Sequence, residues 1–314
     1  MRGTLVGIVG PTATGKTAVG IELAKKLDGE IISADSMAVY KLMDIGTAKP
    51  TLRERAETAF HLVDVVYPDE DFSVAEFKRC AEDAIQDILR RGRVPLLVGG
   101  TGLYVRAVTG GLNIPKAGPD PELRERLKSE AADLGNEHLL ARLNEVDPVT
   151  ASRLHPNDLK RIIRALEVYE LTGFPISHFH ETAGTSEAPC AVRPFGLTMS
   201  RPALYERIER RVDEQIESGL IEEVRMLLDK GYKADLPSMR GLGYKQIAGY
   251  VQGNYSLEEA VFLVKRDTRR FAKRQFTWFR ADDRVYWIDV EDLSANETAE
   301  RIMHLLESCA DMSL

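Results

Sequence analysis

One segment near the start of the chain constrains the fold more than any other. Leu5 to Val9 is a short apolar run rich in β-branched residues, Gly10 to Thr17 is a glycine-containing loop (Gly-Pro-Thr-Ala-Thr-Gly-Lys-Thr), and Ala18 to Leu27 has helical periodicity. Glycines at both ends of the loop let consecutive backbone N–H groups converge on phosphate oxygens at a helix N-terminus. The segment therefore predicts a phosphate loop in an α/β sheet. A glycine-rich turn that binds nothing is the alternative.

The loop also carries the two side chains that phosphate chemistry requires. Lys16 supplies a positive charge, and the hydroxyl of Thr17 can ligate Mg²⁺. The predicted diphosphate- or nucleotide-binding residues are Gly10, Pro11, Thr12, Ala13, Thr14, Gly15, Lys16 and Thr17. The loop alone does not distinguish a diphosphate from a triphosphate such as ATP, and it does not identify the reaction.

Length and composition limit the class of protein. A chain of 314 residues is long for one core, so a main domain with an elaboration is expected. No apolar stretch approaches the roughly 20 residues that span a bilayer, which favours a soluble, intracellular protein. Cys80, Cys190 and Cys309 are scattered and indicate neither a disulfide framework nor a zinc site.

Two further strand ends bring polar residues toward the phosphate loop. Residues 30–36 are predicted to form a second strand that ends in Asp35 and Ser36. Asp35 is expected near the phosphate loop, because ligands of open parallel sheets bind beyond the carboxyl ends of strands. As an alternative, Asp35 caps a helix that begins at Met37. Val94 to Val98 is a buried strand, and the following turn presents Thr101 rather than the strand-end Asp of a nucleotide hydrolase. A plain strand-to-helix turn would explain this segment as well.

The predicted secondary structure of the chain changes at Pro115. Short helical patterns, interrupted by Gly and Pro, continue to about residue 190, and a strand pattern returns at Ala191. The sequence predicts an α/β core made of residues 1–114 and 191–314, with an all-helical insertion at 115–190.

Positive charge is concentrated in the last predicted long helix. The net charge of −7 argues against a surface that binds nucleic acid everywhere, but residues 265–280 contain seven basic side chains and a single acid, Asp267. An ordinary solvated helix would interleave acids, so this segment favours contact with nucleic acid. Arg240 to Lys245 places two glycines beside basic residues, which suits an anion, although a plain turn explains it nearly as well.

Several motifs together resemble bacterial tRNA dimethylallyltransferases (tRNA isopentenyltransferases). The resemblance runs from residue 4 to about 290, and Asp44 to Pro50 (Asp-Ile-Gly-Thr-Ala-Lys-Pro) is its most specific part. The other motifs are Gly10 to Thr17, Ser33 to Ser36 (Ser-Ala-Asp-Ser), Gly99 to Tyr104 (Gly-Gly-Thr-Gly-Leu-Tyr), His155 to Asp158 (His-Pro-Asn-Asp) and Lys273 to Arg280 (Lys-Arg-Gln-Phe-Thr-Trp-Phe-Arg).

This resemblance implies both a fold and an activity. The implied fold is a P-loop NTPase-like, kinase-like parallel sheet with a helical insertion and C-terminal helices that grip the anticodon stem-loop of tRNA. The implied enzyme transfers the dimethylallyl group of dimethylallyl diphosphate to N6 of the adenosine 3′ to the anticodon, with Mg²⁺ as cofactor. A cytoplasmic monomer is expected, with no membrane and no obligate protein partner.

The resemblance also assigns residues. It makes Asp35 the general base and places Thr101 and Arg210 near the reacting centre. The implied tRNA contacts are Asp35, Ser36, Met37, Ala38, Thr101, Arg124, Leu159, Lys160, Arg161, Ile162, Ile163, Arg240, Gly241, Leu242, Gly243, Tyr244, Lys245, Lys273, Arg274, Gln275, Phe276, Thr277, Trp278, Phe279 and Arg280.

Three rival functions are compatible with parts of the sequence. They are a small-molecule P-loop kinase, a nucleotide-gated RNA-binding protein without catalysis, and an isopentenyltransferase acting on free adenine nucleotides. The basic helix favours the tRNA enzyme over the first and third, because a small acceptor needs no such grip.

Overall fold

The computed structural model describes residues 3–110, 112–115, 118–181 and 190–311. The chain divides into two compact units, Met1–Val108 with Pro189–Leu314, and Thr109–Ala188. The sequence pattern had placed these boundaries at 114/115 and 190/191, and separate folding of the insertion stays a prediction. None of the helices in the described ranges is long and apolar enough to cross a membrane.

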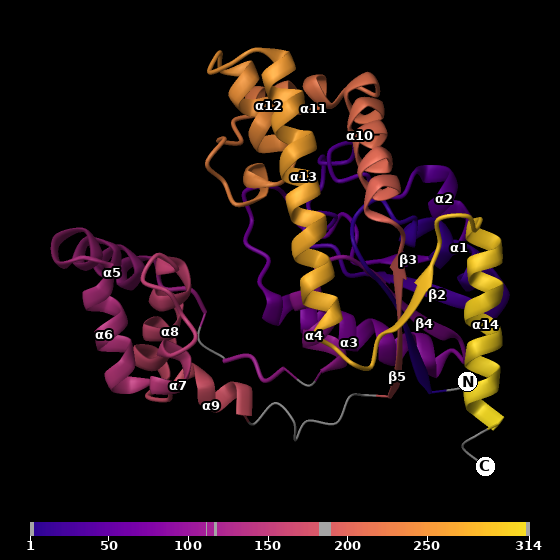
Figure 1. Ribbon diagram of the computed structural model, residues 1–314, viewed down its shortest axis with the longest axis horizontal. Helices are drawn as coiled ribbons and strands as arrows, with labels where there is room; N and C mark the ends of the chain where they lie inside the picture. Colours follow the sequence, from indigo (N-terminus) through magenta and orange to yellow (C-terminus); the bar gives the residue numbers. More distant parts are fainter. Residues whose placement is uncertain (1–2, 111, 116–117, 182–189, 312–314) are drawn as a thin grey trace. The chain divides into compact units, whose positions relative to one another are not determined.

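A six-stranded parallel sheet lies at the centre of the first unit (Figure 1). In spatial order its strands are β3 (Phe60–His61), β2 (Gly29–Ser33), β4 (Val94–Gly99), β1 (Thr4–Val9), β5 (Ala191–Thr198) and β6 (Tyr286–Asp289). Val9 pairs in register with Gly99 on one side and with Gly196 on the other. The carboxyl ends of these three strands therefore meet at one edge, which is where an open parallel sheet binds its ligands.

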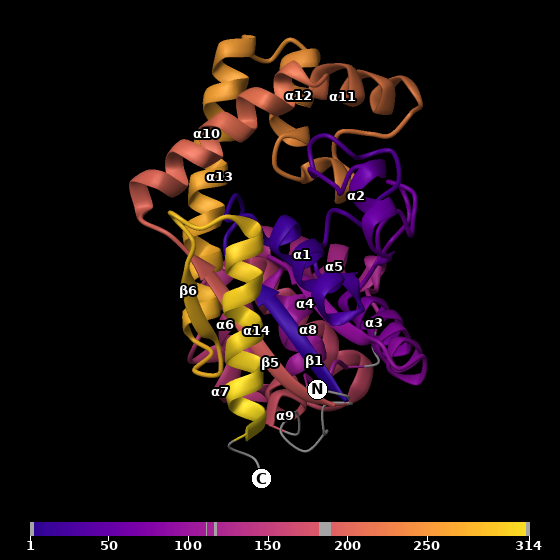
Figure 2. The same cartoon turned by 90° about the vertical axis from the view of Figure 1, so that its right-hand side faces the viewer.

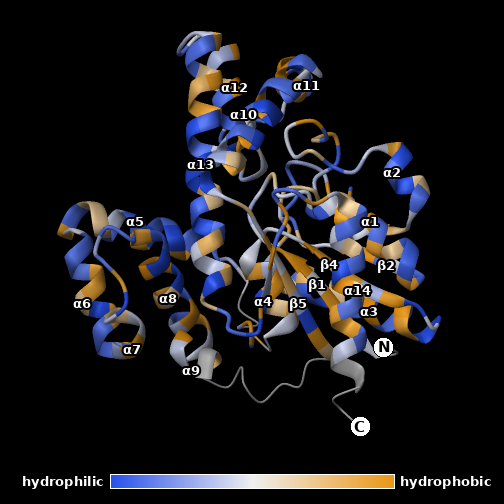
Figure 3. Cartoon of the chain, turned by 45° about the vertical axis from the view of Figure 1, so that its right-hand side comes forward, coloured by the Kyte–Doolittle hydropathy of each residue, from blue (hydrophilic) through white to orange (hydrophobic). Residues whose placement is uncertain are grey.

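Helices cover both faces of this sheet. Val6 and Ile8 pack against α1 (Lys16–Leu27) and α14 (Ala295–Asp311), which lie side by side, whereas Leu5 and Val9 face α3 (Val74–Arg90) and α4 (Gly102–Thr109) (Figure 2). The alternation follows from the two-residue period of a strand. Figure 3 shows the resulting hydrophobic strands between helices with hydrophilic outer surfaces.

A helical lobe of the same unit stands beyond the carboxyl edge of the sheet. It contains α10 (Arg201–Glu217), α11 (Leu220–Asp229), a 3₁₀ turn (Ser238–Arg240), α12 (Tyr244–Val251) and α13 (Leu257–Arg280). Its core includes Val224, Met239 and Ile247, and it also takes in Val39 and Met43 from the segment after β2. The loop that follows Asp35 is thus fixed between the sheet and this lobe. The short α2 (Leu52–Glu57) follows and has no buried residue.

The second unit is all helical in the part that the structure describes. It comprises α5 (Pro121–Leu134), α6 (Asn136–Val146), α7 (Pro148–Ala151), α8 (Leu159–Thr172) and α9 (Ile176–Glu181). Leu127, Leu139 and Ile162 belong to its own hydrophobic core. Glu167, fully buried, is neutralised by Arg124 and Arg164, so the unit also has an internal ion-pair network.

Strand β3 is only two residues long, Phe60–His61. The apolar residues of 61–66 predict a longer strand, but the chain leaves the sheet after His61. Leu62 and Asp64 adopt left-handed backbone conformations with φ of 61° and 57°, which stop an extended strand. The chain instead turns, and Val66 forms an isolated parallel bridge with Tyr40.

Candidate active site

The phosphate loop has the backbone geometry that an anion site requires. Gly10, Ala13 and Gly15 have φ of 133°, 66° and 85°, so the chain reverses its curvature and turns its N–H groups inward. At Gly10 a Cβ atom would lie 2.7 Å from the carbonyl oxygen of Leu197, so only glycine fits there. Helix α1 begins at Lys16 with no side-chain cap at Gly15, which leaves its first N–H groups available to a bound anion.

Lys16 lies in this loop with a strongly perturbed ammonium group. Its Nζ donates to the carbonyl oxygen of Pro11 at 2.6 Å. The pKa of Lys16 is lowered to about 7, chiefly by burial and also by the Arg211 guanidinium, whereas the carboxylate of Asp35 opposes the change. An anion placed beside Lys16 would restore its charged form. The loop therefore favours the binding of an anion beside Lys16.

Two adjoining cavities open around this loop. The larger, about 900 Å³, is lined by the phosphate loop from Thr12 to Ala18 with the exception of Thr14, by Ala38 and by most of the segment Asp44–Arg55. The smaller, about 290 Å³, lies against Ser36, Thr101 and the turn Arg240–Tyr244. A common wall lines both cavities and consists of Thr12, Ala13, Asp35, Thr47, Arg211, Gln215, Phe271 and Gln275.

Asp35 stands in this common wall. It follows β2 by two residues, half-buried, and its Oδ1 accepts the N–H of Met37 at 2.8 Å. That bond fixes the side chain and is a local turn contact, since no helix begins at Met37. The second carboxylate oxygen has no hydrogen-bond partner among the described residues. A fixed carboxylate with a free oxygen between two cavities suits a proton acceptor.

Thr101 completes the same edge from the neighbouring strand. Its Oγ1 accepts the N–H of Ser36 at 3.0 Å, and the two hydroxyl oxygens of Thr101 and Ser36 are 3.3 Å apart. The N–H of Thr101 donates to the carbonyl oxygen of Ala34. The turns after β2 and β4 are thereby joined, and both hydroxyls lie at the smaller cavity.

The arginine of this site is Arg211, not Arg210. The side chain of Arg210 is 63% exposed and lies 3.7 Å from Glu214, and it lines neither cavity. Arg211 lines both, and Asp35 opposes the lowering of its pKa by burial. Helical spacing could have found this, because Arg211 lies three positions after the buried Ile208 and so shares its face, whereas Arg210 does not.

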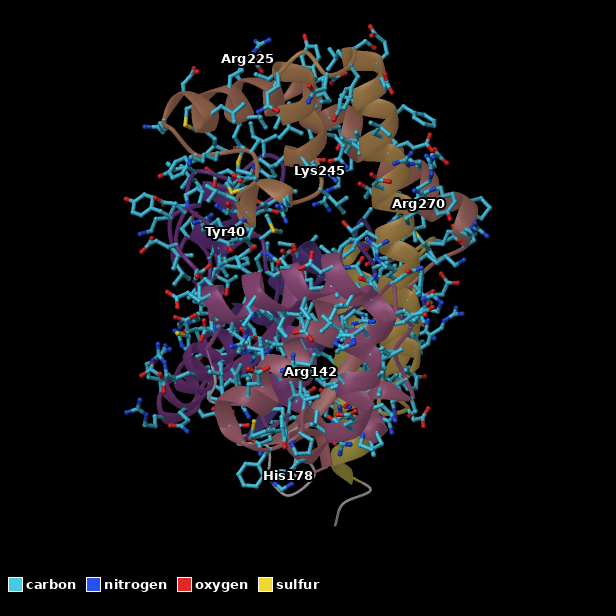
Figure 4. All side chains as sticks on the ribbon, turned by 90° about the vertical axis from the view of Figure 1, so that its left-hand side faces the viewer. Tyr40, Arg142, His178, Arg225, Lys245 and Arg270 are labelled. Carbon is cyan, nitrogen blue, oxygen red and sulfur yellow. The ribbon has the colours of Figure 1, made fainter. Side chains whose placement is uncertain are left out.

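The segments assigned to tRNA contain both exposed and buried members. Arg240, Lys245, Lys273, Arg274, Thr277, Trp278 and Arg280 are exposed in the first unit, as are Lys160 and Arg161 in the second. Ile162, Ile163 and Phe279 are at most 5% exposed and belong to hydrophobic cores, so the expectation that they contact tRNA is corrected to a packing role. Arg124 is held by two bonds to Glu167. Figure 4 shows Lys245 and Arg270, on the neighbouring helices α12 and α13.

The charge on α13 is smaller than its sequence indicates. Acids on the adjacent α10 neutralise two of the basic residues, since Lys265 pairs with Asp213 at 2.7 Å and Arg269 with Glu209 at 2.6 Å. Within the described ranges, Lys273, Arg274 and Arg280 have no carboxylate within 4 Å. The positive surface is therefore concentrated at the C-terminal end of the helix.

Sequence reasoning missed the role of Gln275. It is 6% exposed, and its Oε1 accepts the N–H of Thr12 at 2.8 Å while its Nε2 donates to the carbonyl oxygen of Gly100 at 2.9 Å. A Cβ at Gly100 would lie 2.3 Å from that nitrogen. Gln275 therefore joins α13 to the phosphate loop and to the turn that carries Thr101. Its helical spacing from Ala272 and Phe279 places it on the buried face of α13, and this spacing is the sequence signal for an inward role.

Oxygen ligands for a metal are sparse. No group of three or more His, Cys, Asp or Glu side chains that could hold an ion occurs in the described ranges. Thr17, which carries a hydroxyl, lines the larger cavity beside the phosphate loop. This suits Mg²⁺, which commonly keeps several waters and binds through one or two protein groups and the phosphates of a substrate.

Comparison with known families finds two matching models. A model described as IPP transferase matches residues 38–282, and one described as isopentenyl transferase matches residues 3–66. The chain is 53% identical over 297 residues to a tRNA dimethylallyltransferase of Desulforudis audaxviator, covering 95% of each chain. It is 49% identical over 303 residues to that of Carboxydothermus hydrogenoformans, covering 96% of this chain and 97% of the relative.

Solved structures agree with these relatives. The tRNA isopentenylpyrophosphate transferase of Bacillus halodurans superposes with a TM-score of 0.73 at 44% identity, covering 98% of this chain and 96% of the other. A eukaryotic dimethylallyltransferase acting on tRNA gives a TM-score of 0.82 at 28% identity, covering 98% and 79%. The predicted fold class, a P-loop-like α/β sheet, is confirmed.

Proposed function

The chain belongs to the IPP transferase family, and from this premise we propose that it transfers the dimethylallyl group of dimethylallyl diphosphate to N6 of the adenosine 3′ to the anticodon in tRNA. The observation that carries the proposal is the common wall of the two cavities. Asp35 and Arg211 stand between a space above the phosphate loop and a space beside Thr101. Two substrates bound in these spaces would meet at Asp35.

The larger cavity suits the diphosphate substrate. The uncapped N–H groups at the start of α1 and the ammonium of Lys16 face the place where a leaving diphosphate gains negative charge. Mg²⁺ held by Thr17 would add charge neutralisation to the same oxygens. The phosphate loop in this role releases diphosphate rather than transferring a phosphoryl group.

The smaller cavity suits the adenine. The adenine must leave the base stack of the anticodon loop to enter this cavity, since the reacting carbon of the dimethylallyl group lies inside the protein. As the N6–C1 bond forms and the C1–O bond to diphosphate breaks, the amine loses a proton, and the free oxygen of Asp35 accepts it. Thr101 lies at this cavity and positions the reacting groups through its contacts to Ser36, and Arg211 contributes positive charge near the departing anion.

The exposed cations of α13, of α12 and of the 3₁₀ turn before α12 suit the phosphates of the RNA. Lys273, Arg274, Arg280, Arg240 and Lys245 are exposed, and within the described ranges none of them has a carboxylate within 4 Å. Cations of this kind supply the sequence-independent part of nucleic-acid affinity. We infer that the enzyme acts as a monomer in the cytoplasm, where its tRNA substrate is found.

The direct test is incubation of the purified protein with labelled dimethylallyl diphosphate and unmodified tRNA, followed by analysis of the nucleosides. We expect label in N6-dimethylallyladenosine at the position 3′ to the anticodon. Label on free adenine nucleotides alone, phosphorylation of a small acceptor by ATP, or tRNA binding without product would each contradict the proposal.

A further inference from the structure

The segment Asp44–Pro50 is the most specific motif of the sequence, and the chemistry proposed above gives it no role. Asp44, Ile45 and Ala48 line the larger cavity, Gly46 lines the smaller, and Thr47 lines both. These residues have neither helical nor strand conformation, so no regular hydrogen-bond ladder fixes them beside the two substrate spaces.

One carboxylate replaces that ladder. The N–H groups of Asp44 and Ile45 both donate to Oε2 of Glu223, each at 2.9 Å, and the N–H of Gly46 donates to Oε1 at 3.2 Å. Glu223 lies on α11 and is 9% exposed. A buried carboxylate is costly unless donors fill its lone pairs, and three consecutive backbone N–H groups do so here.

The fourth donor links this segment to the other cavity. The hydroxyl of Tyr244 donates to Oε1 of Glu223 at 2.6 Å, and Tyr244 is fully buried. Its ring packs on Gly46, where an added Cβ would lie 2.5 Å from a ring carbon. Tyr244 and Gly243 line the smaller cavity, so Glu223 connects the walls of both substrate spaces.

The opposite side of the same backbone is also fixed. Nε2 of Gln215, on α10, donates to the carbonyl oxygens of Ile45 and Gly46 at 2.8 and 3.0 Å. Side chains from two helices therefore hold both the N–H and the C=O groups of the segment. The phosphate loop takes no part in these contacts.

We propose that Glu223 is a positioning residue that holds Asp44–Thr47 as the wall against which the hydrocarbon end of the diphosphate substrate rests. The inference builds on the proposed function, in which the phosphate loop binds the diphosphate end. With the wall fixed, the reacting carbon is held at the boundary between the cavities, beside Asp35. The distance between the reacting carbon and N6 of the adenosine then depends on Glu223, whereas binding of the diphosphate anion alone does not.

The test is Glu223→Gln, with Glu222→Gln as the matched control because the neighbouring side chain is 68% exposed. In Gln an NH2 group replaces one carboxylate oxygen and cannot accept a hydrogen bond, so the donors that now meet that oxygen lose their acceptor. We expect kcat/KM for dimethylallyl diphosphate to fall about 10- to 100-fold. The Kd for inorganic diphosphate and for an anticodon stem-loop should stay at the wild-type value, as should all constants of Glu222→Gln.

Two outcomes of the Glu223→Gln experiment would overturn the proposal. One is wild-type kinetics in Glu223→Gln, and the other is an equal loss of affinity for inorganic diphosphate, which would mean general structural damage. If Glu223→Gln does not fold, Tyr244→Phe removes only one of the four donors and should give a smaller fall in kcat/KM with unchanged diphosphate affinity. Unchanged kinetics in that variant would also overturn it.

Hydrogen exchange separates this inference from the proposed function. Glu223→Gln, or Tyr244→Phe in its place, should accelerate amide exchange in a peptide covering residues 44–47 and leave the peptide of Gly10–Thr17 unchanged. This readout needs no turnover, so an inactive wild-type protein would reject the function without deciding the role of Glu223. Unchanged exchange at residues 44–47 would reject the positioning role even in an active enzyme.

Discussion

Removal of charge from the end of α13 tests how the protein holds RNA. Lys273 and Arg274 are exposed and have no carboxylate within 4 Å among the described residues, whereas Arg269, one turn earlier, pairs with Glu209 at 2.6 Å. A cation that contacts a phosphate releases a counterion, so the logarithm of affinity falls with the logarithm of salt concentration by about 0.7 to 0.9 per contact. The double variant Lys273→Ala/Arg274→Ala should therefore flatten this slope by about 1.4 to 1.8.

The magnitude is large enough to measure directly. Over a fourfold rise in salt concentration, the double variant should lose about 7- to 12-fold less affinity than the wild type for an anticodon stem-loop. Fluorescence anisotropy at four or more salt concentrations gives the slope. The matched control is Glu209→Gln/Arg269→Gln, which removes a neutral pair and should leave the slope as it is.

Two results would refute this reasoning. An unchanged slope in Lys273→Ala/Arg274→Ala would mean that the end of α13 contacts no phosphate. A control slope that flattens as much as that of the double variant would mean that the ion pairs with α10 do not neutralise the helix.

Further predictions concern the reacting centre, the phosphate loop and the insertion. Asp35→Asn keeps the shape of the side chain but removes the proton acceptor, so turnover should fall roughly 10²- to 10⁴-fold with unchanged affinities, and normal single-turnover rates would exclude Asp35 as the base. Lys16 has a pKa of about 7 in the free protein, and a bound anion raises this pKa. At pH 8, binding of diphosphate should therefore take up more protons in the wild type than in Lys16→Met, which calorimetry in two buffers measures. Equal proton uptake in the two proteins would contradict the assignment of Lys16 as the anion-binding cation. Gln275→Met removes the bonds to Thr12 and Gly100, so the Kd for inorganic diphosphate should rise, whereas a tRNA surface role alone would leave that constant unchanged. Deletion of residues 115–190 with a short bridge should leave a folded core that binds diphosphate and holds tRNA weakly, and loss of cooperative thermal unfolding would show that the insertion belongs to the core.

Local sequence patterns were sufficient for the frame of the site. The apolar run, the glycine loop and the helix up to Leu27 appear in the structure as β1, the phosphate loop and α1, because each depends on residues close in sequence. Asp35 and Thr101 could also be placed, since the carboxyl ends of parallel strands share one edge. Ser73 and Ser256 are N-cap residues whose side chains accept the N–H three positions later, so the starts of α3 and α13 also depend on residues close in sequence.

The tertiary structure decided which side chains of these elements face the site. Glu223 and Asp44 are 179 positions apart in the sequence, and Gln275 and Thr12 are 263 apart, so their contacts depend on how the helical lobe packs on the sheet. The same packing brings Glu209 to Arg269, which reduces a charge that the sequence of α13 alone overstated. It also turns Arg211 rather than Arg210 toward the cavities. A sequence shows the period of a helix, but the partner against which the helix packs determines which face becomes the wall of a site.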